Sequence, residues 1–128
     1  MIVSRKYAGK CTARATLRVD NPDKAFMLAA EFFAPPAPPR VPGIHPTAVI
    51  GKDVELGKDV CIGPYVVIDD GAKIGARTAI DAQCFVGAGT EIGEDGHLYP
   101  QAVVRERCLI GNRVIIHCGS VIGGDGFG

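Results

Sequence analysis

The chain has 128 residues, 47% of them hydrophobic, and its 14 basic and 14 acidic side chains leave no net charge that would favour nucleic acid or an anionic membrane as partner. No apolar run approaches the roughly 20 residues of a membrane helix, and the N-terminus lacks the apolar stretch of a signal peptide. The five cysteines form no CxxC pair, so we expect reduced thiols in a cytoplasmic protein, without a disulfide framework, a zinc ribbon or stable membrane insertion.

The segment 1–33 has the pattern of a mixed α/β unit. Residues 2–4 and 15–19 are strand-like, and residues 21–33 have a helical pattern. Asn21 suits the N-cap and Pro22 the first helical position. The side chains expected on one apolar side of this helix are Phe26, Ala29, Ala30 and Phe33. Two short strands and one helix cannot close a core, so we interpret residues 1–33 as the C-terminal remnant of an α/β domain.

The segment APPAPPRVPG, residues 34–43, follows the predicted helix. Proline removes backbone donors and fixes the backbone in extended conformations, so this composition ends a helix and stiffens the chain. We predict a Pro-rich linker over residues 34–43 and a second domain over residues 44–128.

A strict repeat with a period of six runs from Ile44 to Phe127. Every hexad in this range opens with Ile, Leu or Val, and its second place is most often Gly. Neither a helix nor a single strand has this period. We predict that each hexad is one short strand plus a corner, and that three successive hexads form one coil. The fold class is then an all-β parallel solenoid, with first and fifth places inward and glycine at corners for backbone freedom.

Stacking the sequence at three hexads per coil places charges in columns. One column reads Asp59, Arg77, Asp95, Arg113, and a second reads Glu55, Lys73, Glu91. The signs alternate, which the proposed register explains as pairing between neighbouring coils and which a merely solvated surface does not explain.

One set of hexads, which begin at residues 44, 62, 80, 98 and 116, carries a single charged residue, Asp81. Its outward sixth places form an unbroken apolar ridge: Val49, Val67, Phe85, Val103 and Val121. A ridge of this kind marks an interface, and we predict that it packs against other copies of the chain, most simply in a closed ring. The alternative is that an N-terminal domain folds back over the ridge.

The histidines His45, His97 and His117 are the candidates for metal ligation or base catalysis. His45 and His117 lie four coils apart, about 19 Å, and cannot share a metal. His97 and His117 lie one coil and two positions apart, which gives no ligand set without a third partner. His117 is a candidate general base, but no acid or nucleophile is assigned to it, so a structural role at a corner is favoured. We predict no metal site and no phosphate-binding loop.

The closing hexad IGGDGF departs from the others. It places Asp125 one coil above Arg107, which predicts an ion pair, and Phe127 above Leu109. The exposed Phe127–Leu109 pair is either a small binding surface or a place that a loop covers. The candidate substrate-binding residues are therefore Asp125, Gly126 and Phe127.

The hexad array resembles the left-handed parallel β-helix of hexapeptide acyltransferases. The combination of helix, Pro-rich linker and the segments GIHPTAVI, CFVGAGTEIG, HLYPQAVV and IIHCGSVIGGDGFG is similar, more narrowly, to the UDP-3-O-acylglucosamine N-acyltransferases of lipid A biosynthesis. The resemblance covers nearly the whole chain. The hexads are specific for fold, whereas the linker, the LYP hexad and the terminal DGFG carry the narrower match.

The resemblance implies a homotrimeric acyltransferase with active sites between adjacent solenoids. Such enzymes transfer a 3-hydroxyacyl chain from acyl carrier protein to the 2-amino group of a UDP-linked glucosamine. A histidine acts as general base and backbone N–H groups stabilise the oxyanion, with no metal or other cofactor. The resemblance also implies that residues 1–33 derive from a uridine-binding domain.

The chain departs from this family where catalysis is concerned. The family's catalytic histidine lies beyond the DGFG motif, whereas the sequence ends at Gly128, and His117 does not match that motif. We therefore assign no catalytic residue, keep His117 as the alternative, and expect an internal fragment that is inactive alone.

Three alternatives remain. An acyltransferase that O-acylates UDP-N-acetylglucosamine shares the solenoid, but it begins directly with the solenoid and lacks the preceding segment. A solenoid hydratase of the carbonic anhydrase type has two histidines at positions i and i+5, a spacing that does not occur in this chain. An ice-binding or purely structural solenoid needs flat outward threonine columns, and Thr47 starts none, although a structural role for the chain itself stays open.

Overall fold

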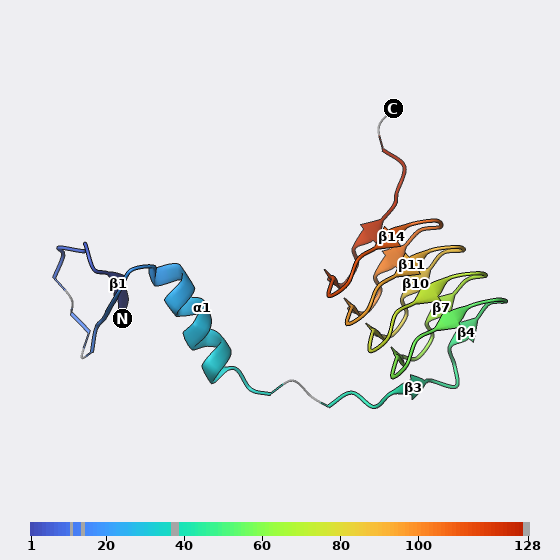
Figure 1. The fold of residues 1–128 in the computed structure, drawn as a ribbon, viewed down its shortest axis with the longest axis horizontal. Helices are drawn as coiled ribbons and strands as arrows, with labels where there is room; N and C mark the ends of the chain where they lie inside the picture. Colours follow the sequence, from blue (N-terminus) through green and yellow to red (C-terminus); the bar gives the residue numbers. More distant parts are fainter. Residues whose placement is uncertain (11, 14, 37–38, 127–128) are drawn as a thin grey trace. The chain divides into compact units, whose positions relative to one another are not determined.

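The computed structural model describes residues 1–10, 12–13, 15–36 and 39–126 of the chain. They form two compact units, Met1–Pro39 and Arg40–Gly128, which are described one at a time (Figure 1). Within the described ranges, no helix has the length and apolar character needed to cross a membrane.

The first unit contains two strands and one helix. β1 (Ile2–Ser4) pairs in parallel with β2 (Leu17–Val19), and α1 (Pro22–Phe33) follows. The Asn21 side chain caps α1 by accepting a hydrogen bond from the Lys24 amide at 3.0 Å. The predicted helix start is confirmed, whereas β2 begins two positions later than the sequence pattern indicated.

The apolar side of α1 is exposed. Its predicted residues line an apolar groove together with the start of β1: Phe26, Ala29, Ala30 and Phe33 with Met1 and Ile2. No residue of α1 is buried. A helix of 12 residues without buried contacts gains little stability from packing, in agreement with the interpretation that this segment cannot close a core by itself.

The second unit is a parallel β-solenoid of two-residue strands arranged in three sheets. Sheet I contains β3 (Gly43–Ile44), β6 (Cys61–Ile62), β9 (Ala79–Ile80), β12 (His97–Leu98) and β15 (Ile115–Ile116). Sheet II contains β4 (Val49–Ile50), β7 (Val67–Ile68), β10 (Phe85–Val86), β13 (Val103–Val104) and β16 (Val121–Ile122). Sheet III contains β5 (Glu55–Leu56), β8 (Lys73–Ile74), β11 (Glu91–Ile92) and β14 (Leu109–Ile110).

The register of these sheets confirms the predicted coil. Every strand pair of the solenoid joins residues three hexads apart in the sequence, for example Val67 with Phe85 in sheet II and Ala79 with His97 in sheet I. Figure 1 shows the resulting stack, in which each turn of the chain lies directly above the previous one. The expected all-β parallel solenoid is therefore confirmed.

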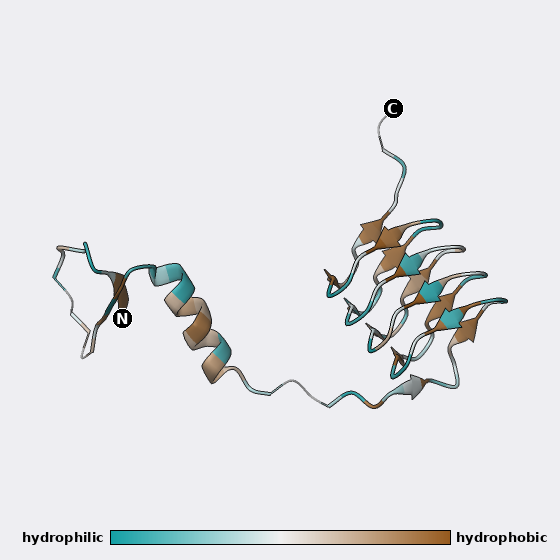
Figure 2. Ribbon diagram, in the orientation of Figure 1, coloured by the Kyte–Doolittle hydropathy of each residue, from teal (hydrophilic) through white to brown (hydrophobic). Residues whose placement is uncertain are grey.

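The core confirms the inward places of the hexad. In the middle coils the first and fifth places are buried, as at Ile68, Leu98 and Val66, which are fully shielded from solvent. Figure 2 shows hydrophobic residues recurring in the strands from coil to coil. Each fully buried aliphatic side chain contributes about 1.5–3 kcal/mol, so the narrow core is a main source of stability.

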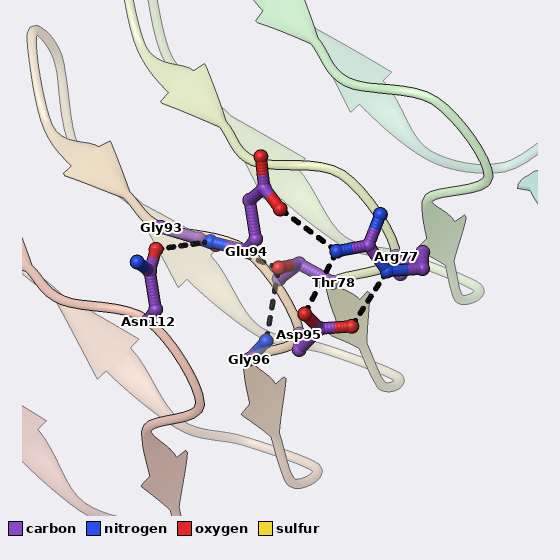
Figure 3. Close-up of polar contacts among 7 residues, drawn as sticks. All are labelled: Arg77, Thr78, Gly93, Glu94, Asp95, Gly96 and Asn112. Atoms are coloured by element: carbon purple, nitrogen blue, oxygen red, sulfur yellow. Dashed lines mark hydrogen bonds and ion pairs between the residues drawn. The ribbon is translucent and has the colours of Figure 1, made fainter.

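Two of the inward fifth places are threonines that hydrogen-bond the backbone. Buried Thr78 donates to the Gly93 carbonyl at 2.7 Å and accepts from the Gly96 amide at 3.0 Å (Figure 3). Buried Thr90 likewise donates to the Arg105 carbonyl at 2.6 Å. These hydroxyls hydrogen-bond backbone groups at the turns of the next coil, so neither hydroxyl is left unpaired in the core.

The glycines of the second place differ from the prediction. Glycine was expected to supply unusual backbone angles, but the left-handed angles lie at the fourth place and are mostly adopted by other residues, such as Asp59 with φ 57° and Arg77 with φ 58°. Most second-place glycines that have a coil above them are needed for space instead. A Cβ on Gly75 would lie 2.6 Å from the Glu94 amide nitrogen in the coil above.

The boundaries of the sequence hexads do not coincide with the flat sides of the solenoid. Each strand combines the sixth place of one hexad with the first place of the next, as in Phe85–Val86. A hexad therefore runs across a corner, and the nearly uncharged hexads wrap the corner between sheets I and II. The apolar ridge is confirmed as one continuous outward column of sheet II.

The last hexad does not build another side of the stack. The chain leaves the solenoid after β16, and residues 123–126 form no strand (Figure 1). The predicted pair of Asp125 with Arg107 is wrong: Asp125 lies 3.9 Å from Arg105 and its side chain is 97% exposed. Because the chain departs from the coil path here, the period of the repeat no longer sets the neighbour.

Both predicted charge columns contain ion pairs between coils. Lys73 lies 3.7 Å from Glu55 and 3.8 Å from Glu91. Arg77 donates two hydrogen bonds to Asp95, at 2.7 and 2.8 Å, and a third to Glu94 (Figure 3). The hydrogen bonds from Arg77 hold the pKa of Asp95 below its usual value. The alternation of signs at these positions is thus pairing between coils.

The space requirement at the second place can be tested with two glycines of one column. Changing Gly75 to Ala is expected to lower the free energy of unfolding by about 1–3 kcal/mol, because the new Cβ would meet backbone of the coil above. Gly111→Ala is the matched control, since a Cβ there has no atom within 4 Å. Denaturant unfolding followed by circular dichroism measures both, and equal losses would contradict this role for Gly75.

The Arg77–Asp95 pair predicts a pH dependence of stability. Because the folded-state pKa of Asp95 is lowered, its contribution is present above the ordinary aspartate pKa of about 3.9 and is lost as the pH falls through the folded-state value. We expect Asp95→Asn to lower the melting temperature at pH 7, and this difference to shrink on acidification. Asp59→Asn, at the same corner position with a similar φ of 57°, is the control and should show a smaller difference.

Candidate functional site

Four side chains that can take part in acid–base chemistry lie on the outer side of sheet I. His97 is the outward residue of β12, and Tyr99 follows that strand. Asp81 follows β9 one coil below, and His117 follows β15 one coil above. The strand and the residue after it point alternately out, in and out, so four chemically active side chains from three coils meet on one surface.

His97 is held by a carboxylate. Its Nε2 lies 2.7 Å from Oδ2 of Asp81, and the side chains are 12% and 36% exposed. Arg40, the first residue of the solenoid unit, places Nη2 2.8 Å from Nδ1 and 2.9 Å from Nε2 of the same ring. An atom within 2.9 Å of both ring nitrogens lies over the face of the imidazole, because a donor in the ring plane at the Nδ1 lone pair would be much farther from Nε2. Arg40 therefore contacts the ring face, while the Asp81 carboxylate holds Nε2.

Two further rings, Tyr99 and His117, continue the cluster from His97. The His97 and Tyr99 ring centroids are 3.9 Å apart, and the Tyr99 and His117 centroids are 5.2 Å apart with an interplanar angle of 18°. The two histidines that the sequence left as loosely spaced are thus joined through Tyr99. His117 is exposed, and its contact in this cluster is a stacking contact rather than a pair with an acid.

The thiol beneath the cluster is inert. Cys84 is 1% exposed and its Sγ donates to the Tyr99 carbonyl at 3.0 Å. Burial raises the pKa of this thiol. A buried thiol with a raised pKa is a poor nucleophile, so Cys84 supports the backbone of Tyr99 and does not act as an attacking group.

This arrangement can orient an imidazole but is not a hydrolytic triad. An aspartate that accepts from one ring nitrogen fixes the tautomer and leaves the other nitrogen as a base. Here the guanidinium of Arg40 covers the ring face, and within the described residues no hydroxyl or thiol hydrogen-bonds Nδ1. Within the described part of the chain, no group of three or more potential metal ligands lies together.

Apart from His97 and His117, the predicted site residues that the structure describes lie away from this cluster. His45 hydrogen-bonds Thr47 through Nδ1 at 2.8 Å, at the other end of the stack. Asp125 and Gly126 lie in the segment that leaves the solenoid, and both are exposed. Phe127 lies outside the described residues, so its predicted position above Leu109 is untested. Asp125 and Gly126 do not line a groove with the histidines in the described structure.

The Asp81–His97 pair was missed by sequence reasoning, although a signal was present. Asp81 is the single charged residue on otherwise uncharged hexads, and His97 lies 16 positions later, within two positions of the coil repeat. A diagonal contact of this kind bridges the sixth and second places of neighbouring coils. Comparing only residues at the same place of the repeat could not reveal it.

The apolar ridge lies around the adjacent corner. Val49 and Val121 at its ends are 59% and 60% exposed, and its middle residues are partly exposed. Next to the ridge, Tyr65 is 64% exposed and Gln101 donates to Gln83 at 3.1 Å. This corner presents apolar and neutral polar groups, which suit contact with another protein surface.

No protein-family model matches the chain. Among curated proteins it is 44% identical over 112 residues to the UDP-3-O-acylglucosamine N-acyltransferase of Pseudomonas syringae pv. tomato, which covers 88% of the chain and 32% of that relative. It is 41% identical over 109 residues to the protein of that name from Polynucleobacter asymbioticus, covering 84% of the chain and 31% of the relative. With the Coxiella burnetii protein of that name the identity is 38% over all 128 residues and 37% of the relative.

The chain thus spans about a third of the length of the curated relatives it matches. Among solved structures, the serine acetyltransferase isoform 3 of Entamoeba histolytica aligns with a TM-score of 0.49 and 16% identity, over 66% of the chain and 35% of that structure. The UDP-N-acetylglucosamine acyltransferase of Arabidopsis aligns with a TM-score of 0.38 and 26% identity, over 62% of the chain and 27% of that structure.

Proposed function

We propose that this chain, which is homologous over most of its length to UDP-3-O-acylglucosamine N-acyltransferases, forms part of such an enzyme. The reaction transfers a 3-hydroxyacyl chain from acyl carrier protein to the 2-amino group of a UDP-linked glucosamine. The observation that carries the proposal is the 38% identity to the Coxiella burnetii relative, which extends through the helix, the linker and the solenoid. Residues 1–33 are proposed to derive from the uridine-binding domain of such a protein.

The assembly we propose is a homotrimer closed through the ridge of sheet II. Its support is physical: an apolar column runs the height of sheet II beside a corner with almost no charge, whereas sheet III carries the Glu55–Lys73–Glu91 column. Burying an uncharged surface avoids the free-energy cost of removing charged groups from water. A ring about an axis parallel to the solenoid would bury the ridge of every copy.

For the chemistry, the acceptor amine must lose a proton as it attacks the thioester carbonyl, so the reaction calls for a general base. Asp81 holds Nε2 of His97 and Arg40 covers the face of its ring, and the contact of His117 in this cluster is a stacking contact. We therefore propose that neither histidine serves as the base, and that the chain alone has no acyl-transfer activity.

A segment exchange tests the proposed function. The aligned third of the Coxiella burnetii relative would be replaced by this chain, and transfer from acyl carrier protein to the UDP-sugar measured by mass spectrometry of the product. We expect transfer by the chimera and none by the chain alone. A folded chimera without activity would count against the proposal, and turnover by the chain alone that is lost in His117→Ala would show that His117 is the base.

The interface can be tested on the chain alone by light scattering. We expect a mass near three times 13.4 kDa, reduced by Phe85→Glu because a charge would be buried in the middle of the ridge. Leu109→Glu is the matched control, an outward apolar residue of sheet III that is 79% exposed. A monomer at all concentrations, or equal effects of the two substitutions, would contradict the proposed interface.

A further inference from the structure

The corner between sheets I and II differs from the other two corners of the solenoid because it carries no charge. Each corner is a turn formed by the third and fourth places of a hexad, and these places form columns along the stack. The fourth places between sheets III and I are Asp59, Arg77, Asp95 and Arg113. The corner between sheets II and III carries both signs, at Lys52, Asp53, Asp70, Glu106 and Arg107. Between sheets I and II, no third or fourth place holds an acidic or basic residue.

The uncharged corner exposes side chains that both donate and accept hydrogen bonds. Its fourth places are Thr47, Tyr65, Gln83, Gln101 and Gly119. All of them are exposed, and Tyr65 is 64% exposed. Tyr65, Gln83 and Gln101 share a left-handed backbone, with φ of 56°, 60° and 63°, so successive coils present these side chains in the same way. Because a hydroxyl or an amide is both donor and acceptor, it can bond to a group of its own kind.

The amides of this column already make such a bond between coils. Nε2 of Gln101 donates to Oε1 of Gln83 at 3.1 Å. Lower in the stack, the backbone amide of Tyr65 donates to Oγ1 of Thr47 at 3.0 Å. Within the described residues, Nε2 of Gln83, Oε1 of Gln101 and the Tyr65 hydroxyl make no hydrogen bond, so they are available to a partner outside the chain.

Rotational symmetry restricts which corner can lie beside the axis of a ring. A rotation about an axis parallel to the solenoid leaves the height of every residue unchanged, so a residue beside the axis meets copies of itself. Like charges at one height repel each other, which disfavours the two charged corners at this position. Side chains that both donate and accept can instead bond their counterparts around the axis. The corner between sheets I and II avoids like charges in every coil.

We propose that the axis of the homotrimer runs beside this corner, where Tyr65, Gln83 and Gln101 of each copy meet their counterparts at one height. This inference rests on the proposed homotrimer and adds to it the residues at the axis. Gln83 lies two residues before Phe85 of the ridge, so the neutral corner adjoins the ridge. An axis beside the corner therefore places the ridge next to the neighbouring copy, and closure of the ring buries both.

A charge at Gln83 tests the position of the axis. Gln83→Glu and Gln83→Lys each place three like charges at one height. We expect each to raise the concentration at which half of the chains are assembled by at least roughly tenfold, measured by light scattering over a dilution series. An equimolar mixture of the two variants should assemble better than either alone, because opposite charges then meet. A variant that had lost its fold would gain nothing from mixing.

Asp53→Lys is the matched control for the charge test. Asp53 is an exposed fourth-place residue of the corner between sheets II and III, with a φ of 55°. Because this corner lies away from the proposed axis, the change of charge should leave assembly as it is in the wild type. Equal weakening by Asp53→Lys, or no gain when the two Gln83 variants are mixed, would overturn the position of the axis.

Cross-linking at Gln101 tests the same axis without a charge. Gln101→Cys is made in a Cys118→Ser background, since Cys118 is an exposed thiol of the same corner. A short bis-maleimide should join the substituted position of one copy to the same position of another, and mass spectrometry identifies this peptide linked to itself. Arg113→Cys in the same background is the matched control. It lies at a fourth place with a φ of 57°, on the corner between sheets III and I, and should give no such link.

These measurements separate the axis from the homotrimer itself. A wild-type chain that is trimeric by light scattering, with no self-link in Gln101→Cys or an equally strong one in Arg113→Cys, would overturn the axis at this corner and leave the homotrimer in place. A monomeric wild-type chain would overturn both. Circular dichroism of each variant would verify that the solenoid remains folded.

Discussion

The parallel register that pairs each residue with the one three hexads later is the constraint on which the solenoid depends. A single coil is too thin to enclose a core, so its inward residues become buried only between the coils above and below. Leu98 in the middle of the stack is fully buried, whereas Ile44 in the first coil is 50% exposed although it occupies the same place of the repeat. A shift of one residue would turn every inward side chain outward, so all strands must keep one register.

The same register decides what each polar residue does. Residues at one place of successive coils face each other at the spacing of neighbouring strands, and opposite charges there become pairs, as between Arg77 and Asp95. Close stacking also removes the space for side chains at the second place, where Gly75 lies against the backbone above. At the fifth place, Thr78 is tolerated in the core because its hydroxyl bonds the turn of the next coil. The stacking of coils therefore explains both how the solenoid is stabilised and which residue types occur at each place of the hexad.

The histidine cluster shows how a regular scaffold produces an irregular site. His97 contacts residues at different places of the repeat, and Arg40, which lies outside the repeat, contacts its ring. Asp81 holds one ring nitrogen and Arg40 covers the ring face, which favours a structural role for His97 over base catalysis. The apolar ridge proposed for assembly lies on the neighbouring sheet II, so the same coils build the ridge and the histidine cluster from different residues.

The period of six was enough to determine the fold class, the strand pairing, the inward places and the ion pairs of Lys73 with Glu55 and Glu91 and of Arg77 with Asp95, because a repeat in the sequence becomes a repeat in space when coils stack. The cap at Asn21 followed equally from local rules. The tertiary structure alone decided the diagonal Asp81–His97 contact and the reach of Arg40, because these join different places of the repeat or a residue outside it. It also decided that Asp125 pairs with Arg105, since a chain that leaves the coil path no longer has neighbours set by the period.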